Sequence, residues 1–121
     1  MRYILVPLLL LTACAHHKFD DVRPGEGGVN TVIVKNEDPT EASREALRQV
    51  RAYCDDLKKT PAVTDEKSQY FGDVSEDTYK KMRRAGKAAE EISGGIVKNT
   101  DKATADYAGA GYEETMQFKC E

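Results

Sequence analysis

The chain has 121 residues, of which 40% are hydrophobic and 32% charged, and its formal net charge is −3 at pH 7. This length suits one small domain, and the balance of apolar and charged residues argues against a disordered chain. The mild acidity argues against a nucleic-acid-binding protein, which needs a basic surface to contact phosphates. A domain of this size buries only a modest core, so an additional covalent link would help to stabilise it.

The first residues have the layout of a secretory signal peptide. Arg2 precedes an apolar run, Tyr3–Leu11, and the small residues Thr12 and Ala13 follow it. A membrane-spanning helix needs about 20 apolar residues, and this run supplies roughly half of that number. We therefore expect residues 1–13 to be a signal peptide that is removed from the mature protein.

The end of this segment, Leu11-Thr12-Ala13-Cys14, resembles the lipobox of bacterial prolipoproteins. In that family the cysteine receives a diacylglycerol, signal peptidase II cleaves before it, and the new amino group is usually acylated. The resemblance implies that Cys14 anchors the mature chain in a membrane, because two or three acyl chains hold a protein there firmly. The alternative is an ordinary signal peptide in which this cysteine is incidental.

The residue after Cys14 is Ala15, not the aspartate that retains lipoproteins in the inner membrane of enteric bacteria. For a Gram-negative source, the resemblance therefore implies the periplasmic leaflet of the outer membrane. Residues 14–28 are interpreted as a lipidated, flexible tether, because proline and glycine residues interrupt a stretch without apolar periodicity. His16 and His17 in this stretch lack further ligands nearby, so we interpret them as polar tether and not as a metal site.

Residues 29–121 are expected to form the folded domain. Val29–Lys35 is short and rich in β-branched residues, which favours a strand. A helix follows, with Asp38 as its N-cap, Pro39 in its first position and Glu41 completing a capping-box pattern. Its apolar residues recur every three or four positions and define the face expected to meet the core: Ala42, Ala46, Leu47, Val50, Tyr53, Cys54 and Leu57.

A second strand is expected within Ala62–Gln69, at an edge of the sheet because Pro61 and several charges accompany it. Ser75 is expected to cap a second helix, about Glu76–Ser93, which ends at two glycines. The apolar positions of this helix, as far as Ile92, are expected to face the core.

Residues 96–111 are expected to be a loop with at most one weak helical turn. Tyr112–Cys120 alternates between apolar and polar residues, which predicts a half-buried strand with Cys120 on its inward side. The sequence thus predicts an α+β domain with a sheet of about three strands and two helices.

Two cysteines remain once Cys14 carries lipid. Cys54 lies on the inward face of the first helix and Cys120 on the inward side of the last strand. Because the signal segment directs the chain to an oxidising compartment, we predict a disulfide between them, worth about 4 kcal/mol on the chain-entropy model. A zinc site would need more ligands, and a redox pair would more usually have the Cys-x-x-Cys spacing.

No catalytic, cofactor or metal site emerges from the sequence. The expected domain contains no histidine that could act as a general base. The adjacent acidic pairs Asp55-Asp56 and Glu90-Glu91 diverge around their helices, so a solvated helix face explains them. We therefore expect a protein that is not an enzyme and that binds no cofactor.

Two rows of basic residues are candidates for anion binding. They share the spacing i, i+4, i+7 along the two expected helices: Arg44, Arg48 and Arg51 on the first, and Lys80, Arg84 and Lys87 on the second. Such rows could contact phospholipid, lipopolysaccharide phosphate or peptidoglycan carboxylates. The interpretation that we favour is an ordinary helix surface, in which neighbouring acidic residues pair with the basic ones.

The layout as a whole is similar to that of small two-cysteine lipoproteins of the Gram-negative envelope, many of unknown function. It predicts a non-catalytic, membrane-anchored lipoprotein that presents its domain to an envelope protein partner, in sensing or assembly. The alternatives are a binding module for an anionic envelope component (lipopolysaccharide, phospholipid or peptidoglycan) and, third, a hydrolase or its inhibitor.

Overall fold

The structure is a computed structural model that describes residues 19–121. The expected signal segment, the expected lipidation site Cys14 and the two histidines lie outside the described residues. In chain order, the described elements are β1 (Val22–Pro24), the 3-10 helix η1 (Glu26–Gly28), β2 (Asn30–Asn36), α1 (Pro39–Asp56), β3 (Pro61–Phe71), α2 (Glu76–Ile92), α3 (Thr100–Ala108) and β4 (Gly111–Cys120). None of these helices is both long and apolar enough to cross a membrane.

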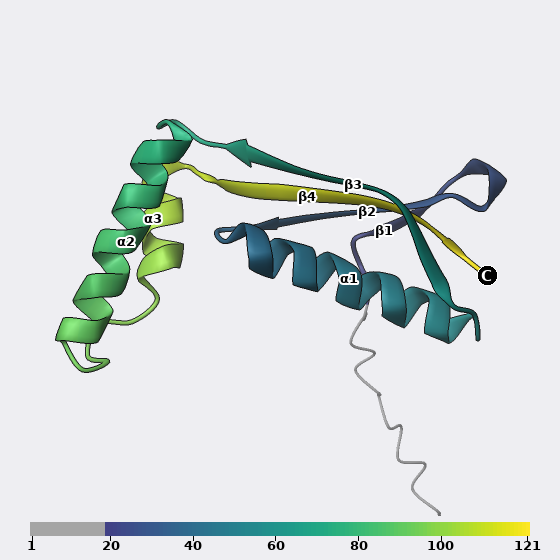
Figure 1. Ribbon diagram of the computed structural model, residues 1–121, viewed down its shortest axis with the longest axis horizontal. Coiled ribbons are helices and arrows are strands. Elements are labelled where there is room, and N and C mark those ends of the chain that lie inside the picture. Colours follow the sequence, from purple (N-terminus) through teal and green to yellow (C-terminus); the bar gives the residue numbers. More distant parts are fainter. Residues whose placement is uncertain (1–18) are drawn as a thin grey trace, which may run out of the picture.

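Four antiparallel strands form one sheet in the order β1-β2-β4-β3 (Figure 1). Helix α1 runs along the strands and covers one face, while α2 and α3 stand as a helical pair at the end of the sheet away from the C-terminus. The α+β class is therefore confirmed, but the fold has four strands and three α-helices where the sequence predicted about three strands and two helices.

Helix α1 begins where its sequence predicts. Asp38 Oδ1 accepts the backbone N–H groups of Thr40 and Glu41 at 2.7 and 3.1 Å, and Pro39 occupies the first turn. The capping box forms only in part, because the N–H of Asp38 donates to Asn36 Oδ1 at 2.9 Å. The Glu41 carboxylate pairs instead with an arginine one turn further along α1.

The main core lies between α1 and the covered face of the sheet. Its buried members are Val22, Val32, Val34, Ala46, Val50, Cys54, Met116 and Phe118. Leu57, which the periodicity placed on this face, is 49% exposed. The reason is that α1 ends at Asp56, so Leu57 is only the C-cap and turns away from the sheet.

The helical pair α2–α3 has a separate, smaller core. Its buried members are Tyr79, Ala108, Ala110 and Tyr112, with Tyr70, Val74 and Ala105 packed against them. The expectation that the apolar face of α2 meets the core as far as Ile92 is wrong, because Ile92 is 87% exposed. Helix α2 packs against α3 beyond the end of the sheet, so only its first turns reach the strands (Figure 1).

Residues 96–111, expected to be mainly a loop, contain α3. The N–H and the hydroxyl of Thr100 both donate to Glu90 Oε1, at 2.9 and 2.8 Å. This carboxylate caps α3 from the preceding helix, while the residue next to Thr100, Asn99, has a left-handed φ of 57°. The residue before α3, Asn99, makes no side-chain capping hydrogen bond. Because this local signal for a helix start is missing, the helix was not predicted from the sequence.

The expected tether, residues 14–28, differs from the structure in its described part. The ring of Phe19 packs edge-to-face on Tyr53 of α1, with 5.4 Å between the ring centroids. Val22, in β1, is only 7% exposed. Because these two apolar side chains reach the main core, the segment that carries them packs with the folded domain and is not a free tether.

Candidate interaction surfaces

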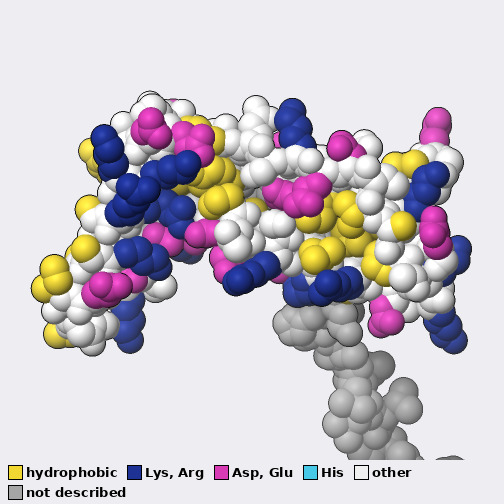
Figure 2. Space-filling view, in the orientation of Figure 1, with side chains coloured by type: hydrophobic (Ala, Val, Ile, Leu, Met, Phe, Trp, Pro, Cys, Tyr) yellow, Lys and Arg dark blue, Asp and Glu magenta, His cyan; other side chains and the backbone are white. Residues whose placement is uncertain are grey.

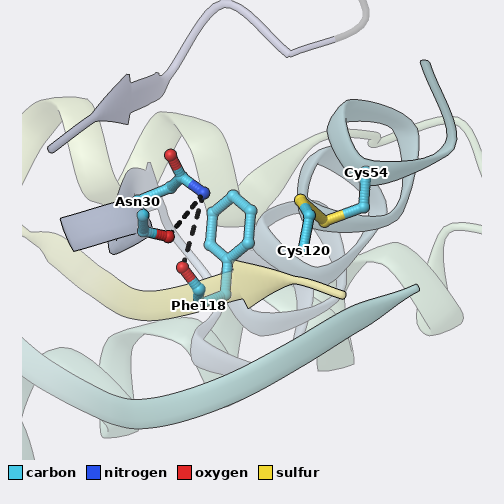
Figure 3. Close-up of a disulfide and its surroundings, with 5 residues drawn as sticks. Asn30, Cys54, Phe118 and Cys120 are labelled. Carbon is cyan, nitrogen blue, oxygen red and sulfur yellow. Dashed lines mark hydrogen bonds between the residues drawn. A yellow bond between two sulfur atoms is a disulfide. The ribbon is translucent and has the colours of Figure 1, made fainter. Parts of the chain in front are cut away.

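The predicted disulfide between Cys54 and Cys120 is present and joins the last turn of α1 to the end of β4 (Figure 3). The two Cα atoms lie 5.3 Å apart, and Cys54 is fully buried. The adjacent backbone is also tied, because Asn30 Nδ2 donates to the carbonyl oxygen of Phe118 at 3.5 Å. This end of the domain is therefore held by a covalent bond as well as by packing.

The basic row on α1 is largely neutralised by its own helix. Arg44 pairs with Glu41 at 2.8 Å, and Arg48 pairs with Glu45. The hydrogen bond from Arg48 is the main cause that lowers the pKa of the Glu45 carboxyl. Arg51 is the one member of this row without an ion-pair partner among residues 19–121. This geometry favours an ordinary helix surface over an anion site.

The basic row on α2 differs, because its members border a hollow. The lining of this space of about 450 Å³ consists of Lys80, Arg83, Arg84, Lys87, Ala88, Glu91 and Asp101. Helices α2 and α3 and the turn between them form a helical hairpin, and Figure 2 shows basic side chains gathered over this part of it. Lys80 pairs with Glu76 at 3.2 Å, whereas Arg84 has no ion-pair partner in the described part of the chain. Lys87 pairs with Glu90 at 3.6 Å and with Asp101 at 3.4 Å. Each row therefore has one member without an ion-pair partner among the described residues, Arg51 on α1 and Arg84 on α2.

Arg83, which the spacing rule did not select, is the most enclosed basic residue of this hollow. Its side chain is 16% exposed and its Nη2 donates to Asp38 Oδ2 at 2.6 Å and to Asp101 Oδ2 at 3.3 Å. Burial works against the charge, but the bonds to Asp101 and Asp38 outweigh it and raise the pKa of the Arg83 guanidinium. Arg83 is therefore engaged in joining α2 to α1 and α3.

A buried carboxyl lies between the two cores. Glu114 on β4 is 1% exposed, and its Oε1 lacks a hydrogen-bond partner among the described residues. Burial, followed by the nearby carboxyl of Glu66, raises the pKa of Glu114 to about 7. The alternation of β4 places Glu114 on the inward side, and an acidic residue at an inward position is the signal in the sequence that points to this group. Because α1 and the sheet enclose it, Glu114 is suited to tuning stability rather than to meeting a substrate.

No strand within residues 19–121 pairs with the outer edge of β3. This eleven-residue strand ends the sheet order, and most of its side chains are exposed while none is buried. The opposite edge is formed by β1, which has three residues. A register shift between Val63 and Asp65 interrupts the pairing of β3 with β4, which leaves a longer regular segment from Asp65 to Phe71. This edge is the longest stretch of backbone that could pair with another chain.

No group of three or more histidine, cysteine or acidic side chains within residues 19–121 is placed to hold a metal ion.

Comparisons with protein-family models, with curated proteins and with solved structures found no match for this chain.

Proposed function

We propose that this chain is a non-catalytic envelope lipoprotein that presents its domain to a protein partner, in sensing or assembly. Acyl chains on Cys14 would anchor it, at the periplasmic leaflet of the outer membrane in a Gram-negative cell. The lipobox-like segment supports the anchor. The Cys54–Cys120 disulfide supports an oxidising compartment, because such bonds persist outside the cytoplasm.

The observation that carries the interaction role is the outer edge of β3, with which no described strand pairs. An exposed strand offers a row of backbone donors and acceptors, and an extended segment of a partner can add to the sheet there. Soluble proteins usually shorten or cover such edges, whereas β3 runs from Pro61 to Phe71. The charged residues Asp65, Glu66 and Lys67 along it would limit unselective pairing and favour a partner of complementary charge.

In-cell photo-cross-linking tests this proposal. A photoreactive amino acid replaces Lys67 or Gln69 on β3, and Asp55, exposed on α1, serves as the matched control position. We expect the β3 positions to give one discrete protein adduct in intact cells and the control position to give none. Equal labelling of many proteins from all positions would contradict a specific partner at this edge.

The anchor is tested separately by the intact mass of the mature protein. We expect a chain that begins at Cys14 and carries added acyl mass. A Cys14→Ala variant should then escape acylation and accumulate with its signal segment uncleaved. A mature chain of unmodified mass would contradict the anchor while leaving the β3 proposal open.

A second candidate function is the binding of an anionic envelope component, and the hollow beside α2 favours it. Three basic residues of one helix face, Lys80, Arg84 and Lys87, border the same space. An Arg84→Glu variant should weaken binding to lipopolysaccharide, phospholipid or peptidoglycan, whichever is the ligand. Arg44→Glu is the matched control, because the Arg44 guanidinium already has a partner on its own helix. Cross-links to glycan or lipid, in place of protein, would favour this function over the first.

A further inference from the structure

The tip of the α2–α3 hairpin exposes two isoleucines almost completely. Ile92, the last residue of α2, and Ile96, in the loop that follows, are each 87% exposed, and Val97 is 42% exposed. Single exposed apolar residues are ordinary on protein surfaces. Two large aliphatic side chains on one projecting turn are less ordinary, because exposing apolar surface to water is unfavourable and the fold does not bury either side chain.

The backbone of the turn holds these side chains outward. Gly94 and Gly95 have left-handed φ angles of 62° and 89°, and their N–H groups donate to carbonyls in the last turn of α2. The hydroxyl of Ser93 accepts the N–H of Val97 at 3.0 Å. The tip is thus a structured turn, so the exposure of its isoleucines is a property of the fold.

The hairpin that ends in this apolar tip is rich in basic residues, and two lysines lie beside the tip itself. Residues 80–102 contain seven lysines and arginines against three acidic residues, a net charge of +4, in a chain whose net charge is −3. A hollow of about 480 Å³ at the tip is bordered by Val97, by the lysines Lys87, Lys98 and Lys102, and by the acidic residues Glu37, Glu90 and Asp101. Lys87 pairs with Glu90 and Asp101. Within the described chain, Lys98 and Lys102 have no ion-pair partner. Figure 2 shows apolar side chains at the end of the hairpin, with basic and acidic ones beside and above them.

An apolar tip flanked by Lys98 and Lys102 has the chemistry of a surface that enters a bilayer with anionic headgroups. Aliphatic side chains at such a surface leave water for the boundary of the acyl chains, and lysines remain among the phosphates. The projecting shape of the tip favours a bilayer as its partner, because a soluble partner would need a cavity to receive it.

The position of Phe19 agrees with this arrangement. Phe19, the first described residue, packs on Tyr53 of α1. It lies five positions after Cys14, and five residues span at most about 18 Å, so an anchor at Cys14 would hold the α1 side of the domain near the bilayer. In Figure 1 the hairpin projects past the sheet toward that same side. The tip can therefore reach the membrane that the anchor occupies.

We propose that the α2–α3 tip is a second membrane contact: Ile92 and Ile96 enter the headgroup region of a bilayer that contains anionic phospholipid, while Lys98 and Lys102 contact the phosphates. Together with the anchor, this contact would fix the orientation of the domain. The inference deepens the second candidate function, since it names phospholipid as the anionic component, and it rests on the proposed anchor for the bilayer within reach. Anchoring makes a weak contact sufficient, because it raises the local concentration of the tip at the membrane.

The chain contains no tryptophan, so one introduced indole reports on one position alone. The full-length protein carrying Ile96→Trp is mixed with vesicles of phosphatidylcholine, with or without phosphatidylglycerol and with brominated acyl chains as quenchers. Tyr107→Trp is the matched control, since Tyr107 is 85% exposed at the other end of α3. We expect a blue shift and bromine quenching for I96W in vesicles with phosphatidylglycerol, and a solvent-like, unquenched spectrum for Y107W.

The charged part of the proposal is tested in the same protein. Adding Lys98→Glu and Lys102→Glu to I96W should abolish most of the shift and the quenching. Absence of quenching of I96W, equal quenching of Y107W, or equal quenching without phosphatidylglycerol would each overturn the proposal, as would a protein adduct at the tip in cells without any lipid contact. Intact mass of the same sample reports acylation, so a missing anchor and a failed tip contact are distinguishable.

Discussion

The guanidinium of Arg83, on α2, lies 2.6 Å from Oδ2 of Asp38, the residue that caps the N-terminus of α1. The other carboxylate oxygen of Asp38 accepts N–H groups from the first turn of α1. One carboxylate therefore serves both as a helix cap and as the docking point of the hairpin. Burial opposes its charge, but the bonds from Arg83 and from the backbone outweigh it and lower the pKa of Asp38.

The first prediction concerns Arg83. Replacing it with methionine keeps much of the apolar stem but removes the bonds to Asp38 and Asp101, so the free energy of unfolding should fall by about 1–3 kcal/mol. Urea unfolding measures this change. Arg44→Met is the control, because the exposed pair with Glu41 should contribute less than about 0.5 kcal/mol. Equal losses in the two variants would contradict the bracing role of Arg83.

The second prediction concerns the disulfide. Cys54 and Cys120 are separated by 66 positions, so reducing their bond should lower the free energy of unfolding by about 4 kcal/mol on the chain-entropy model. Urea unfolding with and without reductant measures the change, and a double Cys54→Ala, Cys120→Ala variant should be insensitive to reductant. An unchanged midpoint after verified reduction would show that the packing of α1 on β4 suffices alone.

The third prediction concerns the pH dependence of stability. Because the pKa of Glu114 is raised from 4.5 to about 7, the folded domain prefers the protonated carboxyl. This contribution to stability is fully present below pH 4.5 and is lost as the pH rises through about 7, a change on the order of 2–3 kcal/mol. Unfolding should therefore become easier across this interval.

A Glu114→Gln variant checks this assignment. It should remove most of the loss of stability between pH 4.5 and 7, because a neutral amide replaces the titrating group. The neighbouring Glu113 is the control, since it lies on the opposite face of β4, with a lysine of β2 3.8 Å away. A Glu113→Gln variant that removed the same dependence would show that the titrating group is not Glu114.

The fourth prediction concerns the start of α3. Glu90 accepts two hydrogen bonds from Thr100, and these bonds are the main cause that lowers the pKa of its carboxyl. A Glu90→Ala variant should let α3 fray, which hydrogen exchange of the amides in residues 100–103 would detect as faster exchange. The exposed neighbour Glu91 provides the control variant, for which the exchange of α3 should not change.

The features that the sequence predicted correctly depend on neighbouring residues. Asp38 caps α1 through residues two and three positions away, and Cys54 and Cys120 lie inward because helix and strand periods place them there. The features that it missed depend on distant residues. Glu90 caps α3 from ten positions away, and Ile92 lies on an apolar stripe beneath which no sheet extends. A period shows which residues share a face, but not what covers that face.

The charged groups of the candidate surfaces also divide into features that depend on neighbouring residues and features that depend on distant ones. The spacing of basic residues found the row on α2, but the exposure of Arg84 and the enclosure of Arg83 follow from where α3 and Asp38 lie. The alternation of β4 put Glu114 on the inward side, yet its raised pKa depends first on burial by the packed elements and then on Glu66 from another strand. Charge pairing between elements could not be predicted before their arrangement was known.

The two separate cores have a consequence for how the domain opens. β4 contributes Phe118 to the core under α1 and Tyr112 to the core under the hairpin, and Glu114 lies between them on the same strand. Only the first core is cross-linked by a disulfide. Under mild denaturation the hairpin half should therefore melt first and the cross-linked half should persist, so the molecule behaves as two cooperative units joined along a single strand.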